Sequence, residues 1–535
     1  MGAQCVGRIA LALCLAPWLA FGQDVAAPAR YPEAFRSIDG RGNNADNPLW
    51  GSAHSELLRI VRADYADGLR APAGGSRLSA RSISNLCAEQ SQSIPNRSGV
   101  SSYVWQWGQF LDHDLSLTVE MEPAESMDIP IPKGDRFFDP DGEGGRTIRF
   151  RRSAFRMTSG SRQQVNSLSA YIDASHVYGS DPERARALRS LDGTGRLAVS
   201  SGDLLPFNTG GFDNGPSPDP TFFLAGDVRA NEQLGLTALH VLFVREHNFW
   251  ADFFRGAYPG LDDDAIYERS RALVAAEMQA ITYNEFLPVL LGPDALPPYR
   301  GYDPSVNAGV SNEFAAAAFR VGHSMLPPEL LRLDPAGQRI ASGHVALADA
   351  FFAPQQIIEH GIDPLLRGLL AQPAQEVDPH IVDGVRNFLF GAPGSGGFDL
   401  ASLNLQRGRD HGLASFNEAR RELGLRPVSS FAEINSDPKV QENLALAFVS
   451  VEEIDLWMGG LSEAHVPGAL VGETFRTILV DQFRRSRDGD RFWYEIYLPP
   501  ELVAVVRRQT LASVLARNTQ LGAEIVPDVF YVPAL

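Results

Sequence analysis

Apolar residues recur at three- and four-residue steps along much of the chain, which is the spacing of one face of an α-helix. The clearest case is the stretch 236–254, whose apolar stripe consists of Leu236, Leu239, His240, Phe243, Val244 and His247. The same periodicity predicts helices over 270–292 and 501–519, and an alanine-rich helix over 314–325. Strand-like alternation is confined to short pieces. The chain is therefore predicted to be mainly α.

Long loops rich in glycine and proline separate the predicted helices. The 49 glycines and 36 prolines exceed their usual combined share of about 12%, and they gather in stretches such as 132–150 and 207–220. There is no internal repeat and no low-complexity linker long enough to separate two domains. Because the motifs described below lie on both sides of 207–220, we predict one large domain over residues 23–535.

The N-terminus predicts a cleavable signal peptide over residues 1–22. Arg8 supplies the basic flank, the stretch 9–21 is apolar, and small residues precede Gln23. The apolar stretch is too short to cross a bilayer, for which about 20 residues are needed. We therefore expect the protein to be secreted or periplasmic and to have no membrane span.

Charge and cysteine content narrow the possible partners. The formal net charge is −18, so we expect no binding to nucleic acid or to an anionic membrane surface. Cys5 and Cys14 leave with the signal peptide, and Cys87 remains alone. The mature chain then has no intramolecular disulfide, and Cys87 is expected to be a small buried apolar residue.

The sequence WGQFLDHDLSLT (107–118) places a histidine between two aspartates. On a helix, Gln109 and His113 share one face and Asp112 lies beside it. Asp114 is rotated by about 100° from His113. The two aspartates should therefore have different partners.

A hard cation is the natural partner for Asp114. The sequence SAYIDAS places Ser169, Tyr171, Asp173 and Ser175 at every second position. Hydroxyl, carboxylate and backbone carbonyl oxygens suit Ca²⁺, which takes six to eight oxygen ligands. Taken alone, the stretch is more typical of an aspartate- or serine-rich turn. Together with Asp114 it predicts a calcium site.

Six motifs occur in order along the chain: WGQFLDHDLSLT, YIDASHVYGS, LAGDVRANEQ, VREHN, AFRVGHSM and LNLQRGRDHG. Together they resemble the animal-type haem peroxidases, the superfamily of myeloperoxidase, lactoperoxidase and peroxidasin. The resemblance extends from about residue 35 to past residue 500. It implies that residues 23–535 form a catalytic domain of mainly α fold, with haem buried between central helices, few short strands and long ordered loops.

The resemblance assigns roles on both sides of a haem. His113 matches the distal histidine that takes a proton from hydrogen peroxide and returns it to the departing hydroxyl. Arg229 matches the distal arginine that stabilises charge on the peroxide oxygens, and Gln109 matches the distal amide that orients water or a halide. His323 matches the proximal iron ligand. The other residues matched to haem contacts are Asn404, which accepts a hydrogen bond from that ligand, and Arg320 and Arg407, which lie near the propionates.

Covalent attachment and calcium also follow from the resemblance. Asp112 and Glu232 match the carboxylates that form ester bonds to haem methyl groups, and Arg229 and Glu232 are expected to face the haem from one helical turn. The cofactor is then a derivative of haem b. The matched calcium ligands are Asp114, Ser169, Tyr171 through its carbonyl, Asp173 and Ser175. His240, His247 and His411 are predicted to be packing or hydrogen-bonding residues.

The implied activity is oxidation of halides, thiocyanate or small phenols by hydrogen peroxide, carried out by a monomer. Myeloperoxidase has a methionine directly after the ester-forming glutamate, and this chain has Gln233 there, which favours bromide, iodide and thiocyanate over chloride. Two alternatives are a fatty-acid dioxygenase of the same fold and a non-enzymatic adhesion or matrix protein. The first uses a tyrosine where this chain has Arg320, and the second should lack His113, Arg229 or His323.

Overall fold

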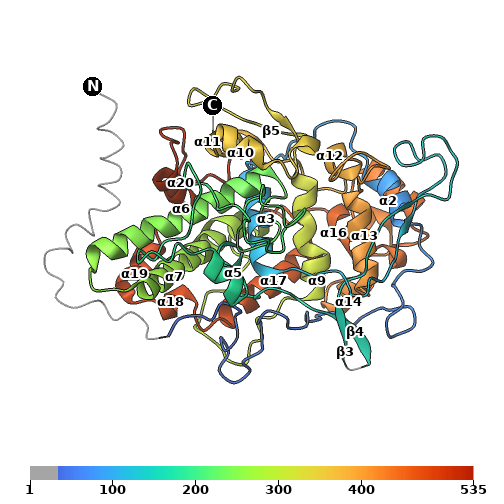
Figure 1. Ribbon diagram of the computed structural model, residues 1–535. Coiled ribbons are helices and arrows are strands. Elements are labelled where there is room, and N and C mark those ends of the chain that lie inside the picture. The colour runs from blue at the N-terminus through green and yellow to red at the C-terminus, as the bar shows by residue number, and fades with distance from the viewer. Residues whose placement is uncertain (1–33, 159, 534–535) are drawn as a thin grey trace.

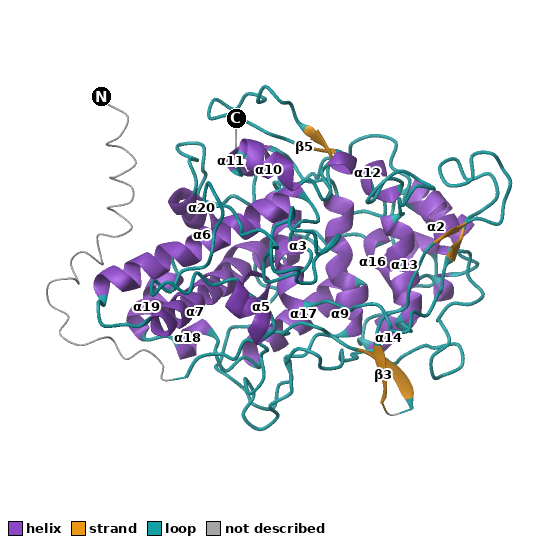
Figure 2. Ribbon diagram, in the orientation of Figure 1, coloured by secondary structure: helices purple, strands orange, loops and turns teal. Residues whose placement is uncertain are grey.

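The computed structural model describes residues 34–158 and 160–533, so the predicted signal peptide lies outside the described residues. Helices make up most of the ordered structure, and long loops wrap around them (Figures 1 and 2). The strands form three separate two-stranded antiparallel sheets: β1 (Ile129–Pro130) with β2 (Thr147–Ile148), β3 (Phe155–Thr158) with β4 (Ser161–Gln164), and β5 (Glu329–Leu330) with β6 (Val345–Ala346). The predicted mainly α fold is confirmed.

Two long helices, α6 (Leu234–Ala257) and α7 (Asp263–Ile281), pack side by side in the left half of the view in Figure 1, where α6 runs toward the centre of the fold. The side chain of Gln233 caps the first turn of α6, and Asp262 caps α7, which satisfies backbone donors that would otherwise have no partner. The predicted helix over 236–254 is confirmed, and its apolar stripe is fully inside.

The predicted helix over 270–292 is present but is not regular. After α7 the chain forms one π-helical stretch, η1 (Thr282–Phe286), and then α8 (Leu287–Leu291), which ends at Gly292. Pro288 stands in the first turn of α8. Because proline has no backbone N–H and its ring crowds the preceding turn, it disturbs the helical ladder at this point.

The segment 314–325 is helical in two pieces. A short α9 (Asn312–Ala316) is capped by Ser311 and is followed by a 3₁₀ helix, η2 (Ala318–Met325). Ala317 separates them with a non-helical backbone, at φ −138° and ψ −74°. The break redirects η2, which carries His323.

The prediction of one helix over 501–519 is wrong. The chain forms α19 (Pro500–Val506) and α20 (Leu511–Asn518) with a turn between them. Thr510 and Ser513 form a reciprocal capping box at the start of α20. This local hydrogen bonding begins a new helix and outweighs the apolar periodicity that runs through the turn.

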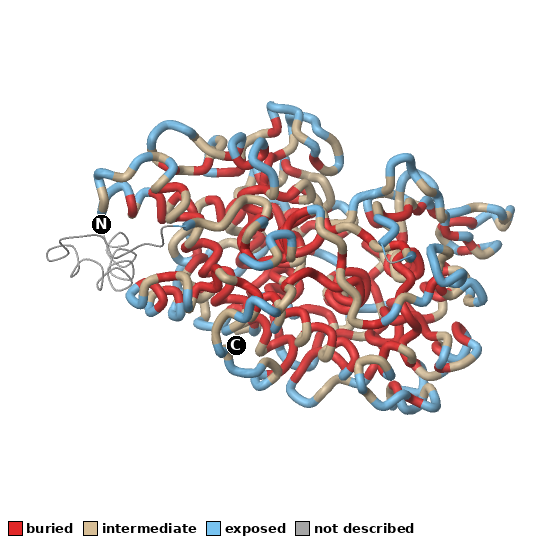
Figure 3. Tube along the Cα trace, turned by 90° about the horizontal axis from the view of Figure 1, so that it is seen from below, coloured by how far each residue is buried: buried red, intermediate tan, exposed pale blue. Residues whose placement is uncertain are grey.

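The other helices surround this centre, as Figure 1 shows. They are α2 (Ala80–Cys87), α3 (Tyr103–Leu115), α4 (Ser175–Tyr178), α5 (Pro182–Ala187), α10 (Pro354–His360), α11 (Asp363–Ala371), α12 (Asp383–Arg386), α13 (Leu400–Asp410), α14 (Phe416–Glu422), α15 (Pro438–Ala447), α16 (Leu456–Ser462), α17 (Glu473–Asp488) and α18 (Tyr494–Tyr497), with short 3₁₀ turns η3 (Leu347–Asp349), η4 (Phe431–Glu433) and η5 (Val451–Glu453). Buried residues fill the interior and exposed residues follow the outer loops (Figure 3).

Cys87 and the three additional histidines are buried, as expected of packing or hydrogen-bonding residues. Cys87 is 2% exposed, and burial raises the pKa of its thiol to about 12. His247 lies 2.9 Å from both the Tyr178 hydroxyl and the Gly195 carbonyl. His411 contacts Ser153 and Asn312. Within residues 34–158 and 160–533, no helix is both long enough and apolar enough to cross a membrane.

Candidate active site

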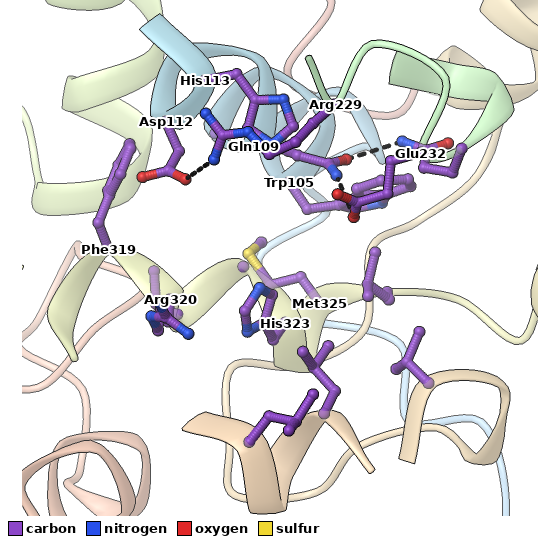
Figure 4. A pocket seen from close by; sticks show the side chains of 18 of the residues that line it. Trp105, Gln109, Asp112, His113, Arg229, Glu232, Phe319, Arg320, His323 and Met325 are labelled. Atoms are coloured by element: carbon purple, nitrogen blue, oxygen red, sulfur yellow. Dashed lines mark hydrogen bonds and ion pairs between the residues drawn. The ribbon is translucent and has the colours of Figure 1, made fainter. Parts of the chain in front are cut away.

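A cavity of about 330 Å³ lies between α3 and η2 and gathers most of the residues singled out in the sequence. Figure 4 shows two groups of side chains facing each other across it. Its lining includes the following predicted site residues: Gln109, Asp112, His113, Arg229, Glu232, Arg320, His323 and Arg407. The structure therefore brings together side chains that are up to about 300 positions apart in sequence.

Helix α3 supplies one wall of the cavity. Gln109, Asp112 and His113 all line it, whereas Asp114 is fully buried on another side of the helix. The Asp112 carboxylate accepts a hydrogen bond from Ser116 at 2.8 Å and lies 3.8 Å from Arg229. The predicted division of the two aspartates between separate surroundings is what the structure shows.

Arg229 and Glu232 reach the same wall from a turn that precedes α6. The backbone N–H of Glu232 donates to the Arg229 carbonyl at 2.8 Å, but residues 228–232 are turns and bends. The expectation that one helical turn carries both residues is wrong. The helix starts only at Leu234, because the Gln233 side chain caps it there.

Three glutamines and Glu232 form a network of side-chain hydrogen bonds at this wall. Gln233 donates through Nε2 to Gln106 at 2.6 Å and to Gln109 at 2.9 Å. Gln109 in turn donates to Glu232 at 3.2 Å. Because Oε1 of Gln109 accepts from Gln233, its amide N–H groups are left to face Glu232 and the cavity.

Burial shapes the protonation of this wall. Burial, with the nearby Arg229 charge, holds the pKa of His113 well below its usual value, so the imidazole is neutral and can accept a proton. Burial raises the pKa of Glu232 to about 7, although Arg229 opposes the shift. The pKa of Asp112 is raised for the same reason. A carboxyl near neutrality in such surroundings is typical of a functional site.

The raised pKa of Glu232 predicts that the free energy of unfolding depends on pH. The pKa of Glu232 in the folded protein, about 7, lies above the ordinary 4.5. The contribution of the Glu232 carboxyl to the free energy of unfolding is therefore fully present below pH 4.5 and is lost as the pH rises through 7. Haem-free wild-type protein should lose about 2 kcal/mol of unfolding free energy over this range relative to Glu232→Gln, a figure reduced because Glu232 is only half-buried. Urea unfolding at pH 4.5, 6 and 8 measures it.

The control for this stability series is Glu359→Gln, which changes a glutamate that is 62% exposed. It should track wild type at every pH. Parallel curves for wild type and Glu232→Gln would show that the Glu232 carboxyl titrates as it does in the unfolded chain.

The opposite wall is formed by η2 and α13. The His323 ring lies with Nδ1 2.7 Å from Nδ2 of Asn404, and Arg320 donates to Oδ1 of Asn404 at 2.8 Å. Burial and the Arg320 charge lower the pKa of His323 to about 3, so its imidazole is neutral and able to bind a metal. Asn404 was expected to accept a hydrogen bond from His323. Instead its oxygen faces Arg320, so that its amide nitrogen faces the ring.

Arg407 lines the cavity from α13 but already has partners. It donates to the Arg151 carbonyl at 3.0 Å, to Ser153 at 2.7 Å and to Asp410 at 3.0 Å. Arg320 also has a partner, Asn404. Burial and the nearby Arg407 charge lower the pKa of Arg320 to about 10. Two cationic side chains at this end of the cavity suit carboxylate groups of a bound cofactor.

The predicted calcium residues lie together behind α3. Asp114 accepts hydrogen bonds from the backbone N–H groups of Asp173, Ala174 and Ser175 and from the Ser175 hydroxyl. Ser169 donates to Asp173 at 2.8 Å. The Tyr171 side chain turns away, and its hydroxyl donates to the Trp50 carbonyl.

The donors in this cluster fit a hard cation. Asp114 and Asp173 are at most 1% exposed, and burial together with the Asp114 charge raises the pKa of Asp173 to about 7. Two adjacent buried carboxylates favour a cation between them. In the part of the chain that the structure describes, no group of three or more histidine, cysteine or acidic side chains is placed to hold a metal, so hydroxyl and carbonyl oxygens must supply the other ligands.

Sequence reasoning missed three polar contacts of the site. Asp227 pairs with Arg229, Gln106 accepts from Gln233, and the Gln233 side chain has a structural role. Asp227 and Gln233 stand inside the motif LAGDVRANEQ, but only tertiary contacts give them their partners. His240, predicted to be a packing or hydrogen-bonding residue, is fully buried and packs edge-on against Phe110; within the described residues, its ring nitrogens have no hydrogen-bond partner.

The cavity also fits a haem as its occupant. An imidazole projects from one wall, a neutral base and a guanidinium face it, and cations and carboxylates stand at its edges. Apolar side chains complete the lining, among them Phe319, Met325, Leu326, Leu347 and Phe351. A large apolar macrocycle with an iron centre and two carboxylates matches this set of groups.

Comparisons with known proteins agree with this picture. The family model for animal haem peroxidase matches residues 35–530. The chain is 39% identical over 519 residues to Peroxinectin A of Dictyostelium discoideum, covering 93% of this chain and 96% of that one. It is 37% identical to the Peroxidasin homolog of Mus musculus, covering 94% of this chain but only 38% of that longer protein. The solved structure of peroxidase A from Dictyostelium discoideum matches with a TM-score of 0.87 and 37% identity, over 93% of this chain and 100% of that one.

Proposed function

The chain belongs to the animal haem peroxidase family, and on that premise we propose that it uses hydrogen peroxide to oxidise bromide, iodide, thiocyanate and small phenols in preference to chloride. One observation supports this proposal above others. Gln109, His113 and Arg229 line one wall of a cavity whose opposite wall carries His323. A base, a cation and an amide donor then meet a peroxide from the side opposite the metal ligand.

The residues on the α3 wall carry the proton and the charge. Nε2 of His113 takes a proton from hydrogen peroxide and returns it to the oxygen that leaves as water. Arg229 stabilises the negative charge that develops on the peroxide oxygens. Bound haem supplies the iron at which the O–O bond breaks and holds the two oxidising equivalents until a donor takes them.

The residues on the opposite wall hold the cofactor. His323 is the iron ligand, and Asn404 sets the orientation of its ring from the other nitrogen. Arg320 and Arg407 bind the propionates. If Arg320 bound a propionate in place of Asn404, the Asn404 oxygen would be free to accept from the His323 Nδ1–H, and Nε2 would be left for iron.

Asp112 and Glu232 attach the haem by ester bonds after turnover with peroxide. Their carboxylates line the cavity on its α3 side, at separate points next to Arg229. We expect wild-type haem to stay with the protein in acidified butanone, and haem in the double variant Asp112→Asn, Glu232→Gln to pass into the organic phase. Absorbance of the two phases measures this. Complete extraction from peroxide-treated wild type would exclude the ester bonds.

The donor preference depends on Gln109 and Gln233. The amide N–H groups of Gln109 face the cavity beside Glu232 and can donate to an anion. Gln233 has no thioether sulfur, so it cannot form the sulfonium link that a methionine provides in myeloperoxidase. Its amide instead contacts Gln106, Gln109 and the start of α6. We therefore place chloride, the anion that is hardest to oxidise, last among the donors.

The experiment is peroxide-dependent halogenation of a cyclic diketone trap by protein supplied with haem and calcium. Turnover with bromide at least about tenfold faster than with chloride supports the proposal, a ratio equivalent to about 1.4 kcal/mol of activation free energy. Equal rates would contradict the donor preference. No turnover with either halide would direct attention to one-electron oxidation of phenols or to oxygen uptake with a fatty acid.

The two alternatives have less support. For the dioxygenase, the position of the radical-forming tyrosine is Arg320, which donates to Asn404. For the adhesion protein, none of His113, Arg229 and His323 is missing, and all three line one cavity.

Calcium binding and export complete the proposal. Asp114, Ser169, Asp173, Ser175 and the Tyr171 carbonyl bind Ca²⁺ and so fix α3 behind the cavity. The protein is secreted or periplasmic after loss of residues 1–22, and it acts as a monomer.

A further inference from the structure

Asp227 contacts both of the residues assigned to peroxide activation. Its carboxylate accepts hydrogen bonds from Nε of Arg229 at 2.8 Å and from Nη2 at 2.9 Å, and also from the Arg229 backbone N–H at 2.8 Å. On the same carboxylate, Oδ1 lies 3.5 Å from Nδ1 of His113. The Asp227 side chain is fully buried.

The backbone around Asp227 is fixed by close packing. Gly226 approaches α4 so closely that a Cβ atom there would lie 2.4 Å from the Ser175 carbonyl oxygen. The next N–H, that of Asp227, donates to the His176 carbonyl at 3.0 Å. A glycine is needed for this close approach. The packing fixes the position of the Asp227 carboxylate behind the cavity.

Among the residues that the structure describes, no other group satisfies Nδ1 of His113. This nitrogen is buried and makes no full hydrogen bond, and the nearest carboxylate to it is that of Asp227. Catalytic hydrogen bonds are often long before substrate is bound and shorten in the working complex. When Nδ1 carries the proton toward Asp227, Nε2 is left with its lone pair.

We propose that Asp227 is a positioning residue that holds His113 with Nε2 as the free base and holds the Arg229 guanidinium beside it. This inference rests on the proposed function, because that function assigns the proton transfer to His113. The carboxylate charge is essential to it. The groups that contact the Asp227 carboxylate, those of Arg229 and Nδ1 of His113, are placed as donors to it, and an asparagine would turn one N–H toward those donors.

The test separates proton transfer from access to the iron. Hydrogen cyanide, like hydrogen peroxide, enters as a neutral acid and must give its proton to a base as its anion binds. Carbon monoxide binds ferrous haem without losing a proton. In haem-loaded Asp227→Asn, we expect cyanide association to ferric protein to slow by about tenfold or more, while carbon monoxide association stays within about twofold of wild type. Stopped-flow absorbance measures both.

Two further variants show whether the effect on cyanide association depends on the carboxylate at position 227. Asp227→Glu keeps the carboxylate and should recover part of the cyanide rate. Asp455→Asn is the control, because Asp455 is a buried carboxylate that also accepts from Nε and Nη2 of one arginine, Arg409, and from Arg77, but away from the cavity. It should leave both rates unchanged.

Three results would overturn the inference. One is an unchanged cyanide rate in Asp227→Asn, and another is an equal slowing of cyanide and carbon monoxide. The third is failure of both Asp227 variants to bind haem while Asp455→Asn binds it, which would make Asp227 a folding residue. If wild type oxidises no halide and the cyanide result still holds, the proposed donor is wrong and the role of Asp227 stands.

Discussion

Replacing His113 by alanine should lower the rate of reaction with hydrogen peroxide by about a thousandfold, within the range that general acid–base catalysis contributes. Haem should remain bound, because His323 and the cations lie on the opposite wall. The loss is large because His113 is the cavity residue whose imidazole is neutral, faces His323 across the cavity and is not engaged as a ligand. Arg229 keeps its charge in the variant but has no lone pair to accept a proton.

Stopped-flow spectra of haem-loaded protein mixed with peroxide measure this rate directly. The control is His54→Asn, at an exposed position with φ +63° where asparagine is tolerated. It should react as wild type does. A His113→Ala protein that reacts with peroxide at the wild-type rate would remove His113 from the mechanism and would move the base to Glu232, the carboxyl on that wall whose pKa is raised to about 7.

The helices were predictable where apolar periodicity and end signals agree. The stretch 236–254 has both, since an apolar stripe follows a side chain that caps the helix. Periodicity alone fails at 507–510, because Thr510 and Ser513 cap a new helix within a continuous apolar pattern. It also fails to show the π-helical stretch at 282–286, which depends on Pro288 and on packing against neighbouring helices.

The cavity residues were predictable from motifs, but their connections were not. His113, Arg229 and His323 stand in motifs that name their roles by resemblance. Asp227, the partner of Arg229, stands in the same motif, but the motif does not show its role. Asp227 acquires its contact with His113 only when the loop before α6 packs against α3 and α4. The sequence shows only that Gln233 stands where myeloperoxidase has a methionine. The structure shows that its side chain caps α6 and orients Gln109.

The orientation of Asn404 illustrates a second limit. Sequence similarity gives an asparagine beside the iron ligand but not which end of the amide faces the ring. In the structure Arg320 holds the amide oxygen, so the amide nitrogen faces His323. The two interactions compete for one oxygen. In the proposed function, where Arg320 would bind a propionate and His323 would bind iron, Asn404 would couple these two events.

Helix α3 connects the cavity with the calcium cluster, because His113 and Asp114 are consecutive residues with opposite surroundings. Burial raises the pKa of Asp173, and the Asp114 charge adds to this shift, so the two carboxylates of the cluster repel each other when both are charged. A bound cation removes that repulsion and ties α3 to the segment before α4. Loss of the cation should therefore lower stability and displace His113 together.

Removal of calcium with a chelator should lower the unfolding free energy of wild type by about 4 kcal/mol when free calcium had been about a thousandfold above its dissociation constant. Asp114→Asn should show little of this calcium dependence, because it removes one of two charged ligands, and its peroxide reaction should be slower because α3 loses its anchor. Thermal unfolding with and without chelator measures the first effect, and stopped-flow absorbance the second.

Asp67→Asn is the matched control, since Asp67 also accepts three backbone N–H groups but lies exposed on a loop. It should retain the full calcium dependence. If wild type unfolds at one temperature with and without the chelator, and dialysed protein contains no calcium, then Asp114 holds the segment 173–175 by hydrogen bonds alone and the cluster is a structural turn.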